Sequence, residues 1–563
     1  MNFSEISSKY TEYRNLLAPF RERVKSARLW YRQAQTEYQG QNKAAPGEPE
    51  SRSGHIFNAV QYKHADLMDN YPRANVLPRE SRDEESAKVL TEVLPFVFER
   101  CGFRKTYCLN LYEKIIVGTS VYGVFYNELA NGRKGEIEIK KIEVLNFTWQ
   151  PDAASLSDSR YVFYDTFMDE ADFKVLYGDR ENIAVQSQYD ETKDVQSEDV
   201  SHTVIITDCY YKKLLSDGRS VLHFVKFSGN EILFSSEDKE EYKDGFYKHG
   251  MYPFVFDILH PVPGEIYGFG LVDIAKDMQG YIDRLDYSIN RSALLTSRNR
   301  YFLREHAGVN EDEFLDASRD IVHVQGDVGE VNLRPIDVKT LPEFVVVHRQ
   351  NKIEELKEIC GNRDFAQGGS AGGVTSGSAI TALQNASDKL VRDAVNFSYI
   401  SYEEIVRLAI ELIREFYDEP RMFRIVGEDG SVDFKSISKS SVFADVENSV
   451  YDISISVEKN NPYSRAFHNQ LIMELSGAGL LDPQNFEKAS FVLKNLNFDG
   501  KDKLIRDLQE VYGNMKAQPM PTPEQSGAGG MGPLVEIPLD NSGELSGGEA
   551  MGGNDPLVEI PLG

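Results

Sequence analysis

The chain has 563 residues, with 62 lysines and arginines against 89 aspartates and glutamates, which gives a formal net charge of −27. This charge argues against a protein that grips nucleic acid tightly, because phosphate binding needs an excess of cationic side chains. Apolar residues make up 41% of the chain, an ordinary share for a globular protein with a core, and its length allows roughly three to five domains.

Two helical regions open the chain. Over residues 3–38, apolar side chains recur at steps of three and four and predict one amphipathic helix. A second helical pattern runs over 56–117 and is interrupted at Pro72 and Pro78. Because proline cannot continue a helix interior, we expect breaks at both positions.

Strand patterns follow. The hydrophobic period changes to two from Val121, and Asn131-Gly132 between two alternating runs predicts a β-hairpin. A second group of strands is expected over 204–234, with turns at Asp217-Gly218 and Gly229-Asn230. The acidic stretches next to these strands are interpreted as solvated loops.

The middle of the chain returns to helix. An apolar stripe predicts one long helix over 270–298, followed by a short mixed segment over 301–333. Thr340, with a proline two residues on and a glutamate three residues on, has the pattern of an N-cap. The helix that it opens should end near Ile359.

A glycine-rich segment precedes the longest predicted helix. Six of the 17 residues from Gly361 to Gly377 are glycine, which predicts a mobile loop. No glycine or proline occurs over 378–419, and apolar residues keep helical spacing throughout, so a helix of about 40 residues is expected there. A hairpin over 423–437, an alternating strand over 453–457 and further helices complete the folded part.

The last 48 residues have a different composition. Residues 516–563 contain ten glycines and seven prolines, with seven acidic side chains and one basic, and cannot bury enough surface to order themselves. Within them PLVEIPL occurs twice, over 533–539 and 556–562. The repeats could dock on a partner, or they could result from a tandem duplication without a role. Their candidate contact residues are Leu534, Val535, Ile537, Leu557, Val558 and Ile560.

No catalytic, cofactor or metal site is predicted. The glycine-rich segment lacks the lysine of a P-loop and follows a helix rather than a strand. The ten histidines form no HExxH motif, and the four cysteines have neither metal nor disulfide spacing, which fits a reducing compartment. Cys101 and Cys108 are expected on one helical face as small buried apolar groups. Neither a membrane span nor a secretory signal is expected.

One basic cluster contrasts with the acidic background. Its members lie at or just beyond the C-terminal end of the predicted 270–298 helix: Arg291, Arg298, Arg300 and Arg304. Cations at a helix C-terminus complement its dipole, which is the simplest interpretation. In a ring of subunits the same cluster would become a positive belt.

The order of the elements and several short phrases resemble tailed-bacteriophage portal proteins, the head-to-tail connectors of the capsid, over about residues 20–510. The phrases are Asn70–Pro72 with Val76–Pro78, Val117–Ser120, Gly250–Pro253, Pro263–Gly270 and Gly372–Ile380. The resemblance implies an α+β subunit with eight regions. These are an N-terminal wing (1–265), a first stem helix (266–298), a clip (299–339), a second stem helix (340–360), a tunnel loop (361–376), a long wing helix (377–419), a wing β segment (420–460) and a helical crown (461–515). The glycine- and proline-rich tail (516–563) departs from the family pattern, in which a long crown would be helical.

The resemblance also implies a function and partners. About a dozen subunits would form a homo-oligomeric ring at one capsid vertex, with double-stranded DNA passing through its channel without sequence specificity during packaging and ejection. The terminase packaging motor and the major capsid, scaffolding and head–tail adaptor proteins would dock on it, with no membrane involved. The tunnel-loop residues expected to face DNA are Gln367, Gly368, Gly369, Ser370, Gly372, Gly373 and Thr375.

Three other interpretations remain open from the sequence. One is a nucleic-acid-processing enzyme, which the missing Walker motifs and ligand clusters disfavour. Another is a different virion structural protein, such as a capsid or adaptor subunit, and the third is a cellular multidomain scaffold. The glycine-rich loop between two long helices at 340–417 favours the portal.

Overall fold

The computed structural model divides into two compact units, Met1–Asn461 and Pro462–Gly563, and every element below belongs to the first. The structure describes residues 3–34, 52–187, 202–215, 218–297, 301–303, 308–315, 321, 323–325, 333–336, 341–361, 389–426, 432–437, 450–457, 477 and 509. The predicted crown and tail therefore lie outside the described residues, apart from two single positions.

Two helices stand where one was predicted at the N-terminus. Helix α1 spans Phe3–Leu16 and α2 spans Ala18–Tyr31. Pro19 lies at the start of α2, and because it has no N–H group the hydrogen-bond ladder stops there. The prediction of one unbroken helix was wrong, although the apolar face is real: Phe20, Val24 and Ala27 are buried.

Three helices and a strand form the next region. Helices α4 (His55–Met68), α5 (Glu84–Arg100) and α6 (Phe103–Val117) follow in order, with strand β1 (Pro72–Pro78) between the first two. Thus the two prolines bound a strand rather than interrupt a helix.

The break between α5 and α6 separates the two cysteines of this region. Gly102 has φ +66° and lies between Cys101, which ends α5, and Cys108 in α6. The expectation that they share one helical face was wrong. Both thiols are partly buried, and Cys108 Sγ lies 3.6 Å from His64 Nε2.

The predicted hairpin is confirmed. Strands β2 (Thr119–Asn127) and β3 (Glu136–Ile142) pair antiparallel, and the loop turns at Asn131 (φ 52°) and Gly132 (φ 68°). These left-handed angles are those that an Asn-Gly hairpin turn needs. The loop contains the segment labelled α7 (Ala130–Arg133), which is not a regular helix because Asn131 and Gly132 have non-helical angles. Strand β10 (Phe254–Ile258) pairs with the other side of β2.

The second group of strands forms a six-stranded sheet in the order β4-β5-β7-β8-β9, with β6 also paired to β7. Turns at Gly218 (φ +84°) and Gly229 (φ +58°) lie where they were predicted. The strands are β4 (Phe147–Thr148), β5 (Tyr161–Asp169), β6 (Val185–Ser187), β7 (His202–Leu214), β8 (Ser220–Ser228) and β9 (Glu231–Ser235), with helix α8 (Glu170–Tyr177) after β5.

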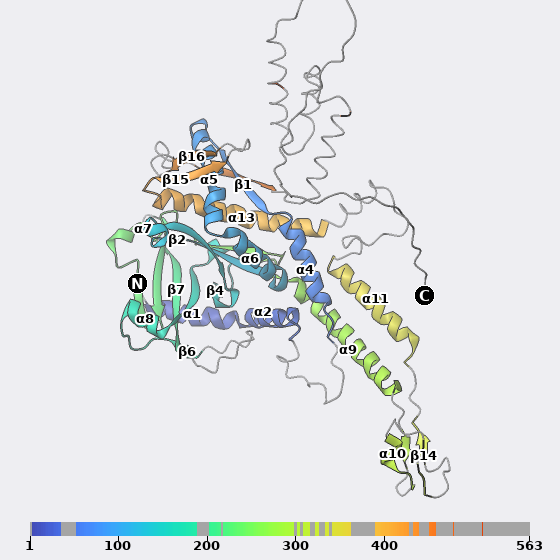
Figure 1. Ribbon diagram of the computed structural model, residues 1–563. Helices are drawn as coiled ribbons and strands as arrows, with labels where there is room; N and C mark the ends of the chain where they lie inside the picture. The colour runs from blue at the N-terminus through green and yellow to red at the C-terminus, as the bar shows by residue number, and fades with distance from the viewer. Residues whose placement is uncertain are drawn as a thin grey trace, which may run out of the picture. The chain divides into compact units, whose positions relative to one another are not determined.

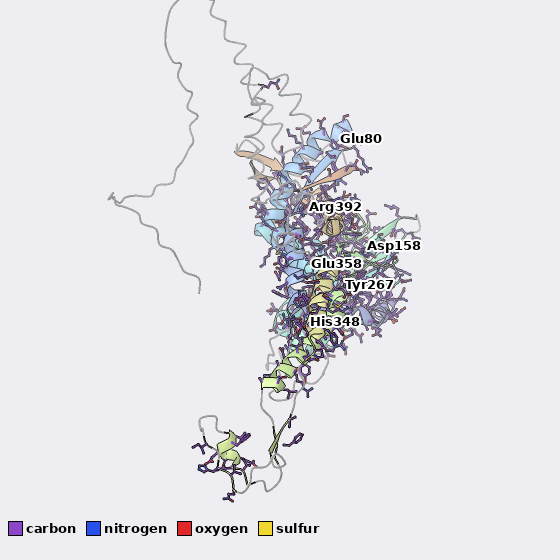
Figure 2. All side chains as sticks on the ribbon, turned by 90° about the vertical axis from the view of Figure 1, so that its right-hand side faces the viewer. Glu80, Asp158, Tyr267, His348, Glu358 and Arg392 are labelled. Carbon is purple, nitrogen blue, oxygen red and sulfur yellow. The ribbon has the colours of Figure 1, made fainter. Side chains whose placement is uncertain are left out.

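A long helix pair follows. Helix α9 spans Leu271–Ser297, close to the predicted range, and α11 spans Glu343–Ile359. The two lie side by side in both views (Figures 1 and 2). Pro342 is the N-cap residue of α11 and makes no side-chain cap, so the expected N-cap at Thr340 was wrong. The predicted mixed segment contributes β13 (Tyr301–Leu303), α10 (Glu311–Leu315) and β14 (Leu333–Pro335), with β13 and β14 paired.

The C-terminal part of the first unit packs against the elements formed by the N-terminal part. Helix α13 is described over Lys389–Phe416, so the first residues of the predicted 378–419 helix lie outside the described part. Strands β15 (Arg421–Val426) and β16 (Val432–Ile437) form the predicted hairpin. Strand β17 (Tyr451–Val457) pairs antiparallel with β1, far earlier in the chain.

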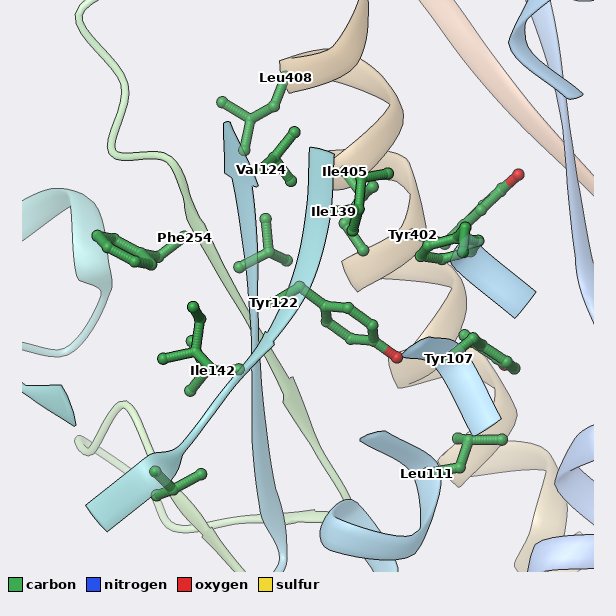
Figure 3. Packing of buried hydrophobic residues seen from close by; sticks show 14 of the residues in the cluster. Tyr107, Leu111, Tyr122, Val124, Ile139, Ile142, Phe254, Tyr402, Ile405 and Leu408 are labelled. Atoms are coloured by element: carbon green, nitrogen blue, oxygen red, sulfur yellow. The ribbon is translucent and has the colours of Figure 1, made fainter. Parts of the chain in front are cut away.

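One large core joins most of the helices and strands of the body. Residues from α6, β2, β3, β10 and α13 interdigitate where the three-stranded sheet faces α13 (Figure 3). Tyr122 and Tyr402 are 1% and 5% exposed at this interface. Each buried aliphatic side chain there contributes about 1.5–3 kcal/mol of transfer free energy. A smaller cluster holds α1 against the six-stranded sheet.

Candidate functional site

The base of α9 lies at a close approach of two backbones. Gly118 ends α6 with φ +88°, and Gly270 immediately precedes α9. A Cβ on Gly118 would lie 2.0 Å from the carbonyl carbon of Phe269, and one on Gly270 would lie 2.2 Å from the carbonyl oxygen of Ile116. Only glycine permits this contact, which we call the glycine junction.

Hydrogen bonds fix the glycine junction. The Gly268 amide donates to Thr119 Oγ1 at 2.9 Å, and the Leu259 amide donates to the Gly118 carbonyl at 3.0 Å. Arg23 Nη2 donates to the Gly268 carbonyl at 2.6 Å. Two of the phrases noticed in the sequence, 117–120 and 263–270, are thus in direct contact.

Further contacts from the start of α4 hold the first half of α9. The Ile56 amide donates to Gln279 Oε1 at 2.8 Å, and Gln279 is 1% exposed. The backbone amide and hydroxyl of Ser53 both donate to Asp283 Oδ1, at 2.9 and 2.6 Å. Burial raises the pKa of Asp283 despite these two donors. The first half of α9 is therefore packed against the globular part of the subunit and hydrogen-bonded to it.

Among the described residues, an ion pair and a contact between Tyr281 and His348 join α9 to α11. Arg349 forms a forked ion pair with Asp286, with Nη2 to Oδ2 at 3.0 Å, and this hydrogen bonding raises the pKa of Arg349. Tyr281 Oη lies 3.3 Å from His348 Nε2. Fork geometry makes the arginine contact directional, so it sets the register of the two helices.

Beyond this ion pair, the described side chains of α9 and α11 are mostly exposed. The buried residues of α9 end at Ile282, and those of α11 begin at Ile353. Phe344 is 69% exposed, Val347 53% and Leu294 42%. These exposed apolar side chains are available for contact with another molecule.

A buried ion pair fixes α13 on the body. Lys114 Nζ donates to Asp257 Oδ1 at 2.6 Å, to Ser398 Oγ at 2.6 Å and to the carbonyl of Ala394 at 2.9 Å. Lys114 is completely buried, and burial lowers its pKa although Asp257 opposes the shift. All three ammonium donors are satisfied, so this cluster is a structural lock rather than a reactive site.

The structure places only one of the predicted site residues. Arg291 is exposed near the end of α9, with its guanidinium 6.0 Å from the centre of the Tyr287 ring. The remaining members of the basic cluster, the tunnel-loop residues and the tail-repeat residues lie outside the described residues. They are Arg298, Arg300, Arg304, Gln367, Gly368, Gly369, Ser370, Gly372, Gly373, Thr375, Leu534, Val535, Ile537, Leu557, Val558 and Ile560.

Among the described residues, no three His, Cys, Asp or Glu side chains are grouped so as to hold a metal ion. None of the helices described is long and apolar enough to cross a membrane.

Sequence reasoning missed the glycine junction and the buried lysine. The glycines were visible in two conspicuous phrases, yet their contact depends on a pairing between distant segments. Lys114 had no signal in the sequence, because a lysine in a helical pattern is normally solvated.

Residues 65–529 match a family model, that of the phage P22-like portal protein. By class the chain is therefore a phage portal protein, a structural component of the virion. It belongs to the P22-like portal family, and the match covers most of its length. No curated protein matches it significantly. The resemblance seen in the sequence and the α+β fold class are both confirmed.

Proposed function

We propose that this chain forms the homo-oligomeric ring at one capsid vertex through which double-stranded DNA is packaged and ejected. The observation that carries the proposal is the helix pair, whose base is locked at the glycine junction while its far half is uncovered. Neighbouring copies in a ring would bury Phe344, Val347 and Leu294. Heterologous contacts of this kind close into rings when the rotation between subunits allows it.

The regions of the subunit are assigned by this proposal. Helices α9 and α11 are the stem, residues 299–339 the clip, and residues 1–265 with 420–460 the wing that surrounds α13. Residues 461–515 are the crown and 361–376 the tunnel loop. The clip is where we expect the terminase motor and head–tail adaptor proteins, while the major capsid and scaffolding proteins contact the outside of the ring.

Passage of DNA requires weak contact along the channel. A subunit with net charge −27 repels phosphate, so DNA is not held by a uniformly cationic surface. Glycine-rich tunnel loops offer the residues 367–370, 372, 373 and 375 as close, uncharged neighbours of the duplex. This arrangement favours sliding without sequence specificity.

The basic cluster would form a positive belt in this ring. Arg291 already lies exposed on α9. We expect replacement of Arg298, Arg300 and Arg304 by glutamate to leave rings intact and to reduce the amount of DNA packaged. Lys140, which is exposed on β3, is the matched control for charge reversal. Full-length packaging by the triple variant would remove the role of the belt.

Electron microscopy of the purified chain, with light scattering for mass, tests the ring. We expect rings with a central hole and a mass about a dozen times 63.7 kDa. Assembly with scaffolding protein present is the second arm, because some rings need a partner to close. A compact monomer or dimer in both arms would overturn the proposal.

A further inference from the structure

A cavity of about 450 Å³ lies between the second half of α13 and the neighbouring ends of β1 and β17. This volume is within the range of about 300–1,000 Å³ that is typical of ligand sites. Three arginines contribute to its lining, which is unexpected in so acidic a chain. The lining residues are Arg79, Arg407, Ile410, Glu411, Arg414, Val450, Tyr451 and Ile453.

The cavity has an apolar floor and a basic rim. Ile410 and Tyr451 are 3% and 8% exposed and form the floor. Arg407 and Arg414 lie two turns apart on one face of α13, a distance of about 10 Å at 1.5 Å per residue. An extended peptide covers this distance with about three residues.

Each rim arginine holds a carboxylate of its own chain. Arg79 pairs with Asp452 at 2.7 Å, Arg407 pairs with Glu403 at 2.8 Å, and Arg414 pairs with Glu411, which also lines the cavity, at 2.8 Å. The Arg79 and Arg407 side chains are more than half exposed, so their two pairs contribute little stability and can be exchanged for another carboxylate. The cavity therefore suits a short peptide with one carboxylate between aliphatic side chains.

We infer that this cavity binds the PLVEIPL repeat of a second copy of the chain. In an extended peptide of this sequence, Val535 and Ile537 occupy one face and Glu536 the other. The two aliphatic side chains then contact the floor, while the carboxylate lies between Arg79 and Arg407. The second repeat, with Glu559, offers the same ligand again and raises its effective concentration. This inference goes beyond the proposed function and does not depend on passage of DNA.

A labelled peptide tests the inference on the full-length chain. The probe is fluorescein-GPLVEIPLD, and its binding is followed by fluorescence anisotropy. The variant Glu536→Lys/Glu559→Lys carries repeats that the rim would repel, so its cavity is free for the probe. We expect this variant to bind the probe at least tenfold more tightly than the wild-type chain, whose own repeats compete.

Substitutions at the rim supply the second arm. In the Glu536→Lys/Glu559→Lys background, Arg79→Gln/Arg407→Gln should weaken probe binding at least tenfold, since charge-assisted hydrogen bonds are lost. Arg392→Gln is the matched control, because Arg392 is exposed on α13 and does not line the cavity. Circular dichroism melts verify that each variant is folded. The probe GPLVQIPLD should also bind at least tenfold more weakly.

Each other outcome overturns the inference. Absence of binding to the Glu536→Lys/Glu559→Lys chain means that the cavity does not take this peptide. Unchanged binding to the rim variants means that the peptide binds elsewhere. Equal binding to the wild-type and Glu536→Lys/Glu559→Lys chains means that the repeats of other copies do not occupy the cavity, and its ligand is then a peptide of another protein.

Discussion

The base and the far half of the helix pair are built on opposite principles. At the base, backbones touch at the glycine junction, and buried polar groups such as Gln279 find partners within the chain. In the far half, one forked ion pair joins the helices and apolar side chains such as Phe344 are exposed. The monomer thus completes its body but leaves the end of the helix pair available for contacts between molecules.

The largest expected effect comes from adding a methyl group at the glycine junction. Gly118→Ala places a Cβ about 2.0 Å from the backbone of Phe269 and also forces alanine into the left-handed region. We expect a loss of more than about 4 kcal/mol in the free energy of unfolding, or no soluble protein. Urea unfolding followed by circular dichroism measures it.

Gly102→Ala is the control for this substitution. Gly102 also has a left-handed φ of +66°, but a Cβ there meets nothing within 4 Å. The expected loss is only about 1–2 kcal/mol, the cost of the left-handed conformation. Similar losses for Gly118→Ala and Gly102→Ala would show that the close backbone approach is unimportant.

Removal of the buried ammonium should have the next largest effect. Lys114→Met leaves the Asp257 carboxylate buried without its cation, which costs about 3–5 kcal/mol of unfolding free energy. Lys140→Met is the control, because Lys140 is 54% exposed in its pair with Glu138 and its loss should cost less than about 1 kcal/mol. Thermal melts compare the two, and equal shifts would contradict the role of the buried pair.

Local periodicity predicted most of the helices and strands, but none of the long-range contacts that hold them together. Helix α9 and the β2–β3 hairpin lie where apolar spacing and Asn131-Gly132 placed them. The pairing of β1 with β17 and the contact of Gly118 with Gly270 depend on segments far apart in the chain, about which one sequence carries no signal. The break at Pro19 is a different case. A proline is a local signal for the end of a helix, but the regular apolar stripe over residues 3–38 favoured one continuous helix.

A smaller effect is expected from the pH response of the body. His249 Nδ1 accepts a hydrogen bond from the Met251 amide at 3.1 Å, and burial lowers the pKa of His249 to about 4. The unfolded chain has a histidine pKa of about 6.5, so it binds more protons than the native state between these values. Stability should therefore fall as pH decreases from about 6.5 to 4, by roughly 1–3 kcal/mol from this ring.

His249→Asn isolates the contribution of this ring. Asparagine keeps an acceptor for the Met251 amide but does not titrate, so the variant should lose less stability than the wild-type chain over the same pH range. The contribution of His249 is the difference in pH-dependent stability loss between the wild-type chain and the variant. A comparison is needed because burial also lowers the pKa of four other histidines, which titrate in both proteins: His55, His64, His223 and His260. Identical pH profiles in urea unfolding would contradict the assignment.

The smallest effect on global stability should come from the ion pair that joins α9 and α11. Arg349→Ala removes a contact whose arginine is 31% exposed, so the free energy of unfolding should fall by less than about 1 kcal/mol. Local opening of α11 should respond as well, because beyond this pair α11 has few buried contacts of its own. Hydrogen exchange over residues 344–352 should become up to about fivefold faster, since a loss of 1.4 kcal/mol would be a factor of ten and the loss here is less than about 1 kcal/mol.

Lys352→Ala tests whether this response is specific to the contact between the helices. Lys352 pairs with Glu355 within α11 at 2.7 Å, so its removal should leave exchange in α11 almost unchanged. In assembled rings, we expect exchange over 344–352 to be slow in both variants, because neighbouring copies would then cover Phe344 and Val347. Fast exchange in intact rings would mean that the exposed half of the helix pair is not a subunit contact, even if the ring itself forms.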